Sequence, residues 1–276
     1  MPIYQAIILG IVQGLTEFLP VSSSGHLILV PWLFGWDELD DESIKKTFDV
    51  ALHLGTLIAV AGYFWSDVVV YVRDGAQVVF SRGKRVTPEG RLGWLLLLAT
   101  VPAALVGAMF EDVIDTKLGT PFIIAISLIV FGIILGWADH RPGTRKLDDF
   151  RTRDALEVGA AQALALNPGT SRSGITMSAA RFGRFDRDAA VRISFLMSLP
   201  VIAGAVVFKG YGAIEEGLPG DLIVPMIVGI ITSGIAGWVA VWGTLRLVQT
   251  HSLMPFVWYR IGLGVFVLIV LAAGWR

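Results

Sequence analysis

The sequence predicts an all-α integral membrane protein, on three observations. Of its 276 residues 54% are apolar and only 16% are charged, with a mean hydropathy of +0.68. A soluble domain is usually about 45–50% apolar and about 25% charged, so much of this surface must face lipid. Six apolar stretches reach the roughly 17–25 residues that a helix needs to cross the hydrocarbon layer. Glycine is also abundant, with 31 residues, as expected where transmembrane helices pack closely.

The six stretches predict six transmembrane helices, and two further apolar regions are interrupted. The predicted spans cover residues 48–65, 92–110, 121–138, 189–208, 222–245 and 255–273. The first interrupted region runs over 2–34 with a break at 20–25, and the second over 154–182 with a break at 168–174. Pro, Gly and Ser in the breaks free backbone groups, which membrane proteins tolerate only beside a polar cavity.

Charge in the connecting segments predicts the orientation. Basic residues concentrate in 73–91, 140–153 and 181–187 and at Arg246, whereas 37–42, 111–115 and 215–216 are acidic. The positive-inside rule places the basic segments in the cytoplasm and the acidic ones outside. The second interrupted region has basic sequence on both sides, and its halves are too short to cross alone. We therefore expect a re-entrant helical hairpin there.

The two interrupted regions resemble each other. Aligning Gln13 with Gln162 also matches a Leu, two Ser and a Gly without gaps, and displaces the Pro by one position. Each copy is followed by three spans, so the second copy must be upside down relative to the first. The sequence thus predicts an inverted-topology repeat within a single membrane domain, with repeats at 1–140 and 150–276 and both termini outside. The alternative is chance similarity between two Ser/Gly-rich turns.

The breaks place ionisable residues where they are costly. A charge at the centre of a membrane helix costs about 2.5–3.5 kcal/mol on insertion scales. Glu17 and Arg172 flank the two breaks, and His26 follows the first. Gln13 lies one helical turn before Glu17 on the same face. One interpretation is that Glu17 and Arg172 only pair to join the repeats; the other is that they form a reactive site.

Hydroxyl side chains favour the second interpretation. They cluster on both breaks, at Ser22, Ser23, Ser24, Ser171, Ser173 and Thr176. A turn that starts a helix presents N–H groups that suit phosphate, and arginine can clamp phosphate oxygens bidentately. A serine beside a base is an activatable nucleophile, although serines at helix starts are more often ordinary caps.

Composition excludes several classes. The net charge of −1 gives no field that would attract nucleic acid, so we expect no such partner. The absence of cysteine excludes disulfides, thiolate metal sites and cysteine-phosphatase chemistry.

Four other polar residues lie near the ends of predicted spans. Asp49 and His53 start a predicted span and either contact the pocket or lie at the membrane–water interface. Arg192 and Arg260, near span ends, are expected to extend to the lipid headgroups.

Both motifs resemble those of the bacterial undecaprenyl-pyrophosphate phosphatases, the bacitracin-resistance family. The resemblance is carried by Gln13 to His26, QGLTEFLPVSSSGH, and by Pro168 to Thr176, PGTSRSGIT, and extends over the whole chain in span order. That family allows Glu or Gln at the position of Gln13, and the Gln weakens any scheme that needs two carboxylates. The histidine lipid phosphatases can be set aside, because they need a histidine six residues after arginine, where this chain has Ser178.

The resemblance implies an enzyme of the bacterial inner membrane, with its site open to the outer face. It would remove phosphate from undecaprenyl pyrophosphate, recycling the lipid carrier of peptidoglycan synthesis and conferring bacitracin resistance. It implies a divalent cation, Mg²⁺ or Ca²⁺, and a homodimer is a further expectation. Glu17 would be metal ligand or base, Ser23 the nucleophile, His26 a proton-transfer group and Arg172 the pyrophosphate ligand.

The remaining motif residues would line the pocket: Gln13, Ser22, Ser24, Ser171, Ser173 and Thr176. His26 or a metal-activated water are the alternative nucleophiles. A secondary transporter or flippase for the same carrier is the alternative function, because inverted repeats with broken helices are typical of transporters.

Overall fold

The structure is a computed structural model that describes residues 1–36, 42–216 and 220–275, and the regular secondary structure of these residues is helical apart from one isolated β-bridge. The α-helices are α1 Ile3–Phe18, α2 Ser23–Phe34, α3 Glu42–Tyr63, α4 Trp65–Phe80, α5 Pro88–Lys117, α6 Pro121–Asp139, α7 Thr152–Ala163, α8 Arg172–Phe182, α9 Arg187–Glu216, α10 Ile223–Val248 and α11 Met254–Ala272. The predicted acidic segment 37–42 falls almost entirely outside the described residues, as do the side chains of 111–115 and 215–216.

Five of the predicted spans each coincide with one helix to within a residue at either end or lie inside it, whereas the first, 48–65, runs across the break at Phe64 between α3 and α4. Among the described residues, five helices are long and apolar enough to cross a membrane, namely α5, α6, α9, α10 and α11. Helices α3 and α4 are long and apolar enough for a sixth span only if they are counted together as one broken span, because the two helices are bent by 83° relative to each other. A multi-pass membrane protein is therefore what length and composition support.

Three connecting segments differ from the prediction. The segment after the first span was expected to be a loop, but its first half is the helix α4, which packs against α5. Its apolar run around Val68–Val72 gives α4 a face to bury, whereas the charge pattern alone had suggested a loop. Residues 111–115, also expected in a loop, continue α5 beyond a kink at Phe110. Residues 215–216, expected in a third loop, form the end of α9.

Both interrupted regions fold as helical hairpins whose two ends meet. The ring of Tyr4, at the start of α1, packs edge-on against Trp36, just after α2, with centroids 6.0 Å apart. At the second hairpin, Arg145 Nη1 links the two ends by donating both to Asp154 Oδ1, at the start of α7, and to the carbonyl of Gly183, just after α8, each at 2.8 Å. Each hairpin therefore begins and ends at the same place.

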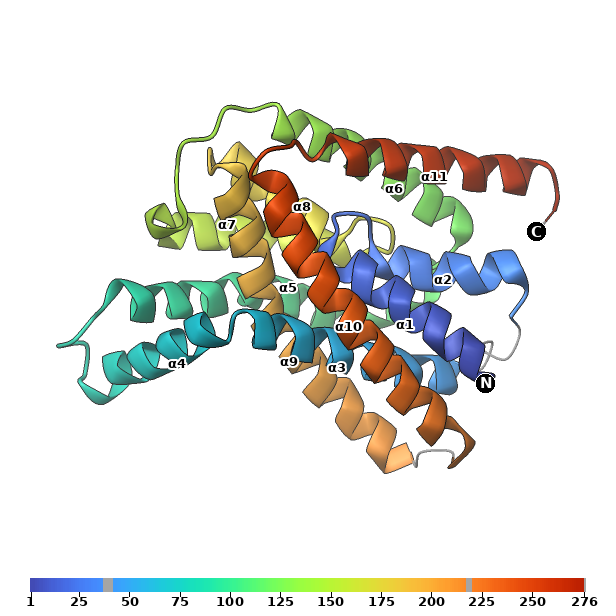
Figure 1. Cartoon of the computed structure of the whole chain (residues 1–276), viewed down its shortest axis with the longest axis horizontal. Helices are drawn as coiled ribbons and strands as arrows, with labels where there is room; N and C mark the ends of the chain where they lie inside the picture. Colours follow the sequence, from blue (N-terminus) through green and yellow to red (C-terminus); the bar gives the residue numbers. More distant parts are fainter. Residues whose placement is uncertain (37–41, 217–219, 276) are drawn as a thin grey trace.

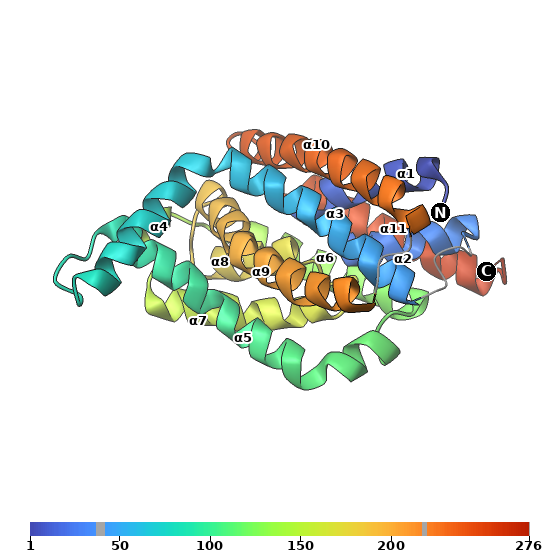
Figure 2. The same cartoon turned by 90° about the horizontal axis from the view of Figure 1, so that it is seen from below.

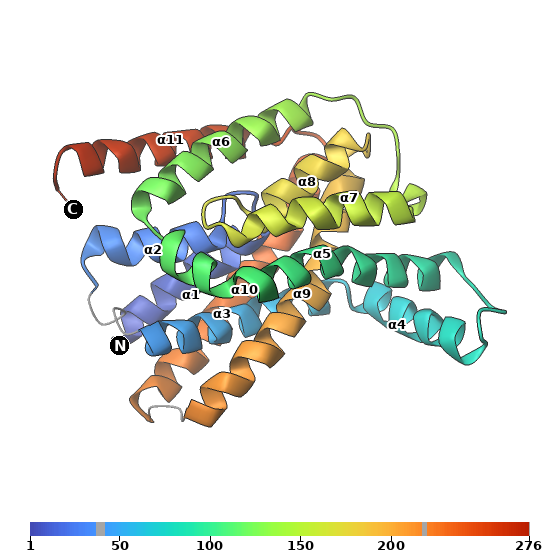
Figure 3. The same cartoon turned by 180° about the vertical axis from the view of Figure 1, so that it is seen from behind.

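Helices of one half of the chain pack on helices of the other. The hairpin helix α1 packs against α10, and its counterpart α7 packs against α5. Likewise α3 contacts α10 while α9 contacts α5, and α6 lies beside α11 (Figure 1). Seen from below, both termini lie at one end of the molecule and the turn between α4 and α5 at the other (Figure 2). This pairing brings the two hairpin turns together in the middle of the molecule (Figure 3).

Candidate active site

The two hairpin turns have the same local structure. Ser22 and Ser171 each precede the second helix with a positive φ, 81° and 74°. Each hydroxyl accepts a hydrogen bond from a glycine N–H three residues on, Gly25 at 3.4 Å and Gly174 at 3.1 Å. Such a φ is uncommon outside glycine, and the cap hydrogen bond offsets its cost. The sequence match between the two regions therefore extends to their backbones.

The turns also bind each other. The N–H of Gly169 donates to Ser22 Oγ at 3.0 Å, and Ser173 Oγ donates to the carbonyl of Leu19, also at 3.0 Å. Arg260, from α11, is fully buried and donates to the carbonyls of Pro20 at 3.2 Å and of Gly169 and Thr170 at 2.9 and 2.8 Å. These contacts hold residues 19–22 and 169–173 in one fixed arrangement.

Glu17 is the centre of the polar cluster that results. Arg172 Nη2 donates to its Oε1 at 2.9 Å. Its Oε2 accepts from Ser23 Oγ at 2.6 Å and from Gln13 Nε2 at 3.2 Å. His53 Nε2, from α3, lies 3.9 Å from the same oxygen. The Glu17 carboxylate is only 5% exposed, so its charge depends on these partners rather than on water.

Arg172 is fixed by a second helix as well. Its Nη1 donates to the carbonyl of Ser194 on α9 at 3.3 Å. Thr176 donates to the carbonyl of Arg172 at 2.8 Å and lies 2.8 Å from Ser194 Oγ. The guanidinium is 13% exposed and keeps N–H groups beyond those used by Glu17 and Ser194, which can bind an incoming anion.

His26 lies in a separate arrangement. Its Nδ1 is 2.7 Å from the carbonyl of Ser22, and its Nε2 is 2.7 Å from the hydroxyl of Tyr259 on α11. Both ring nitrogens of His26 therefore already have a hydrogen-bond partner within the chain, namely the carbonyl of Ser22 and the hydroxyl of Tyr259. Glu17, by contrast, is directly hydrogen-bonded to Ser23.

The oxygen atoms at and around Glu17 could hold a divalent cation if phosphate oxygens of the substrate supply further ligands. No group of three His, Asp or Glu residues among the described residues could hold a metal ion. One carboxylate, Glu17, and one amide oxygen, Gln13 Oε1, are available; the latter is buried without a hydrogen-bond partner. Mg²⁺ is commonly held by one or two carboxylates together with substrate phosphates and waters, and this donor set suits that mode.

Comparison with known proteins places these residues in a family. The family model for the bacitracin resistance protein BacA matches residues 6–266. The chain belongs to this family. The match confirms the resemblance that the two motifs indicated.

Relatives of the family match over nearly their full lengths. A protein from Pelotomaculum thermopropionicum is 43% identical over 274 residues, covering 99% of this chain and 98% of its own. Proteins from Desulforudis audaxviator and Geobacter sulfurreducens are each 46% identical, covering 97% and 99% of this chain and 97% and 100% of their own. All three relatives are named undecaprenyl-diphosphatase.

The structure divides the predicted site residues of this BacA family member: some form one polar cluster, others support the hairpin turns, and His26 lies apart with Tyr259. Gln13, Glu17, Ser23 and Arg172 form one hydrogen-bonded cluster. The other hydroxyls mainly support the turns, as caps or as ties between them: Ser22, Ser171, Ser173 and Thr176. Ser24 is exposed beside Ser22. Their roles toward substrate stay predictions.

Three contacts of the site were missed in the sequence. Tyr259 and Ser194 carried no signal, because each lies outside both motifs, in a largely apolar span far along the chain. Arg260 was expected to reach the headgroups; instead it is 0% exposed and holds both turns. A lone arginine in an apolar stretch was the available signal, and its burial depends on packing that the sequence does not show.

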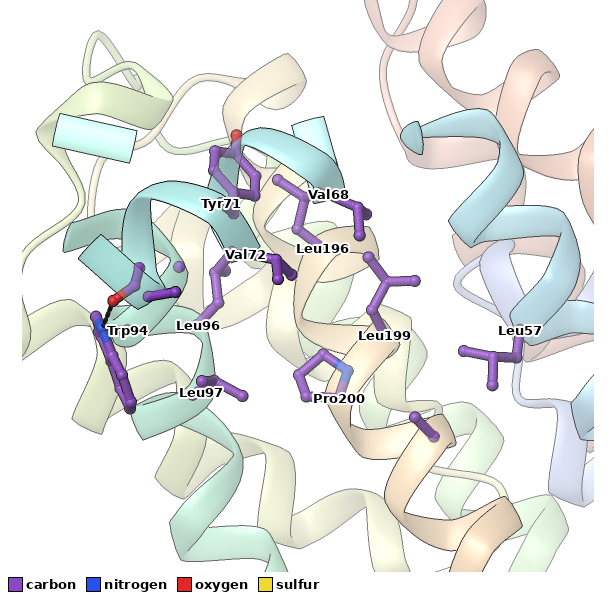
Figure 4. A pocket seen from close by; sticks show the side chains of 14 residues that line it. Leu57, Val68, Tyr71, Val72, Trp94, Leu96, Leu97, Leu196, Leu199 and Pro200 are labelled. Atoms are coloured by element: carbon purple, nitrogen blue, oxygen red, sulfur yellow. Dashed lines mark hydrogen bonds between the residues drawn. The ribbon is translucent and has the colours of Figure 1, made fainter. Parts of the chain in front are cut away.

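An apolar hollow of about 490 Å³ lies away from this cluster, between α4, α5 and α9, with α3 at its edge. Leu96, Leu199 and Pro200 point into it, and the indole N–H of Trp94 is used up by the carbonyl of Gly75 (Figure 4). Tyr71 is the single ionisable residue in its lining. The hollow therefore offers apolar contact and little chemistry, which leaves the cluster around Glu17 as the candidate reaction site.

Proposed function

We propose that this chain hydrolyses undecaprenyl pyrophosphate to undecaprenyl phosphate and phosphate. The observation that carries the proposal is the cluster in which a carboxylate from one hairpin, Glu17, holds a hydroxyl, Ser23, and a guanidinium from the other hairpin, Arg172. Phosphoryl transfer needs a nucleophile, a base and a positive charge, and in this cluster these are Ser23, Glu17 and Arg172. The names of the relatives supply the substrate.

In this proposal Ser23 Oγ attacks the terminal phosphorus. Ser23 already donates to Glu17 Oε2 at 2.6 Å, so Glu17 accepts the proton as the new P–O bond forms. The anhydride P–O bond breaks, and undecaprenyl phosphate leaves with the proton that Glu17 returns to its oxygen. Water then attacks the phosphoserine: Glu17 accepts a proton from the water, the Ser23 Oγ–P bond breaks, phosphate leaves, and Glu17 returns the proton to Ser23 Oγ. Arg172 stabilises the oxygen charges of the transferred group, where electrostatic positioning supplies most of the rate.

The hydrogen bonds favour Ser23 over His26 as nucleophile. His26 would have to release either Ser22 or Tyr259 to attack, whereas Ser23 is already bonded to a base. His26 remains in the proposal as a proton-transfer group. The cation would be held by Glu17 and the amide oxygen of Gln13 together with pyrophosphate oxygens, and it would neutralise the charge of the headgroup.

We further propose that the two hairpins are re-entrant and related by an inverted repeat. The meeting ends of each hairpin, the matching turns and the reciprocal packing of α1 on α10 and α7 on α5 support this arrangement. The site then opens to the outer face of the bacterial inner membrane, where the used carrier accumulates, and the isoprenoid tail stays in lipid between helices. This location fits recycling of the carrier for peptidoglycan synthesis.

The test is phosphate release from farnesyl pyrophosphate by purified protein in detergent, with and without chelator. We expect activity with Mg²⁺ or Ca²⁺ and its loss with chelator. Arg172→Lys and Glu17→Gln should each lower kcat by about 100-fold or more, since lysine cannot replace the fork geometry and the amide cannot accept a proton. Thermal melting of each variant separates this effect from unfolding, because removing one partner of a buried pair also costs stability.

Arg192→Lys is the matched control. Arg192 pairs with Asp188 on the surface of α9, where side chains are more than a third exposed, so its activity should stay near that of the unmodified protein. Wild-type turnover in Arg172→Lys would refute the pocket assignment. A chain that only transports the lipid would release no phosphate in detergent, where there is no compartment to cross.

A further inference from the structure

The tautomer of His26 follows from its two contacts. The carbonyl oxygen of Ser22 can only accept, so Nδ1, 2.7 Å away, carries the proton. In the neutral ring Nε2 then has the lone pair, and the hydroxyl of Tyr259, also at 2.7 Å, donates to it. Tyr259 thus contacts the only ring nitrogen with which His26 can take up a proton.

Tyr259 lies on α11, and the neighbouring residue Arg260 fixes the position of this helix relative to the first hairpin. Arg260 donates to the carbonyl of Pro20, two residues before Ser22, and to the second turn at Gly169. The side chain of His26 is buried, while Tyr259 is 49% exposed. The two rings lie nearly parallel, with an interplanar angle of 9° and centroids 5.7 Å apart.

The hydroxyl group of Tyr259 has one evident purpose. Within the described part of the chain, the only hydrogen bond of this hydroxyl is to His26. Phenylalanine would fill the same space on a half-exposed face equally well and would leave a buried imidazole nitrogen without a donor, which costs free energy.

We propose that Tyr259 is a positioning residue for His26. Its hydroxyl holds the imidazole in the Nδ1–H form, with the Nε2 lone pair facing α11 rather than Ser23. His26 therefore exchanges protons with the pyrophosphate group of the substrate either through the Tyr259 hydroxyl or after the hydrogen bond between His26 and Tyr259 has broken. This inference rests on the proposed function, in which His26 is the proton-transfer group.

Tyr259→Phe tests the proposal by ¹⁵N-histidine NMR in detergent. The chain has four histidines, so the His26 signals can be assigned by their loss in His26→Gln. We expect Nε2 of His26 to appear as a hydrogen-bonded acceptor in the unmodified protein and to shift away from that value in Tyr259→Phe. Tyr211→Phe, an exposed tyrosine on α9, is the control and should leave the spectrum unchanged.

Kinetics provide the second readout. Tyr259→Phe should lower kcat about 10-fold with KM within twofold, because proton transfer contributes about 10²–10⁴ and the ring itself remains. In the His26→Gln background the same substitution should have no further effect, since both act through one residue. An additive loss in the double variant, or an unchanged His26 spectrum in Tyr259→Phe, would overturn the proposal. Absent phosphate release in the unmodified protein would refute the phosphatase instead, while the spectra would still test the Tyr259–His26 contact.

Discussion

At the scale of single residues, Arg260 shows how a charge can be kept inside a membrane protein by backbone carbonyls, with no carboxylate paired to it among the described residues. Its guanidinium donates to four carbonyls, those of Leu128 in α6 and of Pro20, Gly169 and Thr170 in the turns. The breaks in the two hairpins leave these turn carbonyls without helical partners, and arginine has enough donors in a planar fork to satisfy several at once. Arg260 is therefore a structural tie between the two copies of the hairpin.

Replacing Arg260 by Met should destabilise the protein by about 3 kcal/mol or more, because several buried carbonyls lose their donor. The midpoint of thermal unfolding in detergent measures this loss, and phosphate release should fall with it. Arg192→Met is the comparison, since that surface residue should cost about 0.5 kcal/mol or less. Equal melting of both variants would show that the buried contacts carry no stability.

At the scale of elements, close packing of α1 on α10 positions Glu17. A methyl group on Gly14 would lie 2.5 Å from the carbonyl oxygen of Ser233 and 2.7 Å from the N–H nitrogen of Gly237. These atoms belong to the backbone of α10 and cannot turn aside. Glycine is needed here for close approach, as small residues often are between membrane helices.

Gly14→Ala should therefore lower both stability and activity, although alanine favours a helix by about 1 kcal/mol. The two helices must separate, and Glu17, one turn further along α1, moves relative to Arg172. Gly243→Ala on α10 is the matched control, because a methyl group there meets no atom within 4 Å. Melting and phosphate release are measured for both; a Gly14→Ala protein as stable and active as the control would contradict the packing argument.

At the scale of the whole molecule, the pairing of helices across the two halves is what closes the site. Glu17 and Ser23 come from the first hairpin and Arg172 from the second, 155 residues after Glu17 in the sequence. Neither half of the chain holds the cluster alone. With an inverted arrangement, the turns meet near the midplane and both chain ends lie on one side.

Topology can be tested directly because the chain has no cysteine. Single cysteines at Asp221 and Trp275 should react with a membrane-impermeant maleimide on spheroplasts, in which the outer layers of the cell are removed and the inner membrane is intact. Cysteines at Lys84 and His251 should react only after permeabilisation, since the basic segments are expected inside. All four positions are exposed, so a lack of labelling reports on the side of the membrane and not on burial. The reverse pattern would invert the orientation.

The sequence by itself determined the membrane class, the six apolar stretches and the two related breaks, because hydropathy and helix-breaking residues act locally. It also indicated which ionisable residues were costly to bury, and Glu17 with Arg172 proved to be hydrogen-bonded. It could not place α4, since apolar valines and scattered charges allow either loop or helix until α5 offers a packing surface. Only the tertiary structure decided that Arg260 ties the turns and that Tyr259 faces His26. These contacts join residues 90 to 240 positions apart, and no local pattern encodes which helices become neighbours.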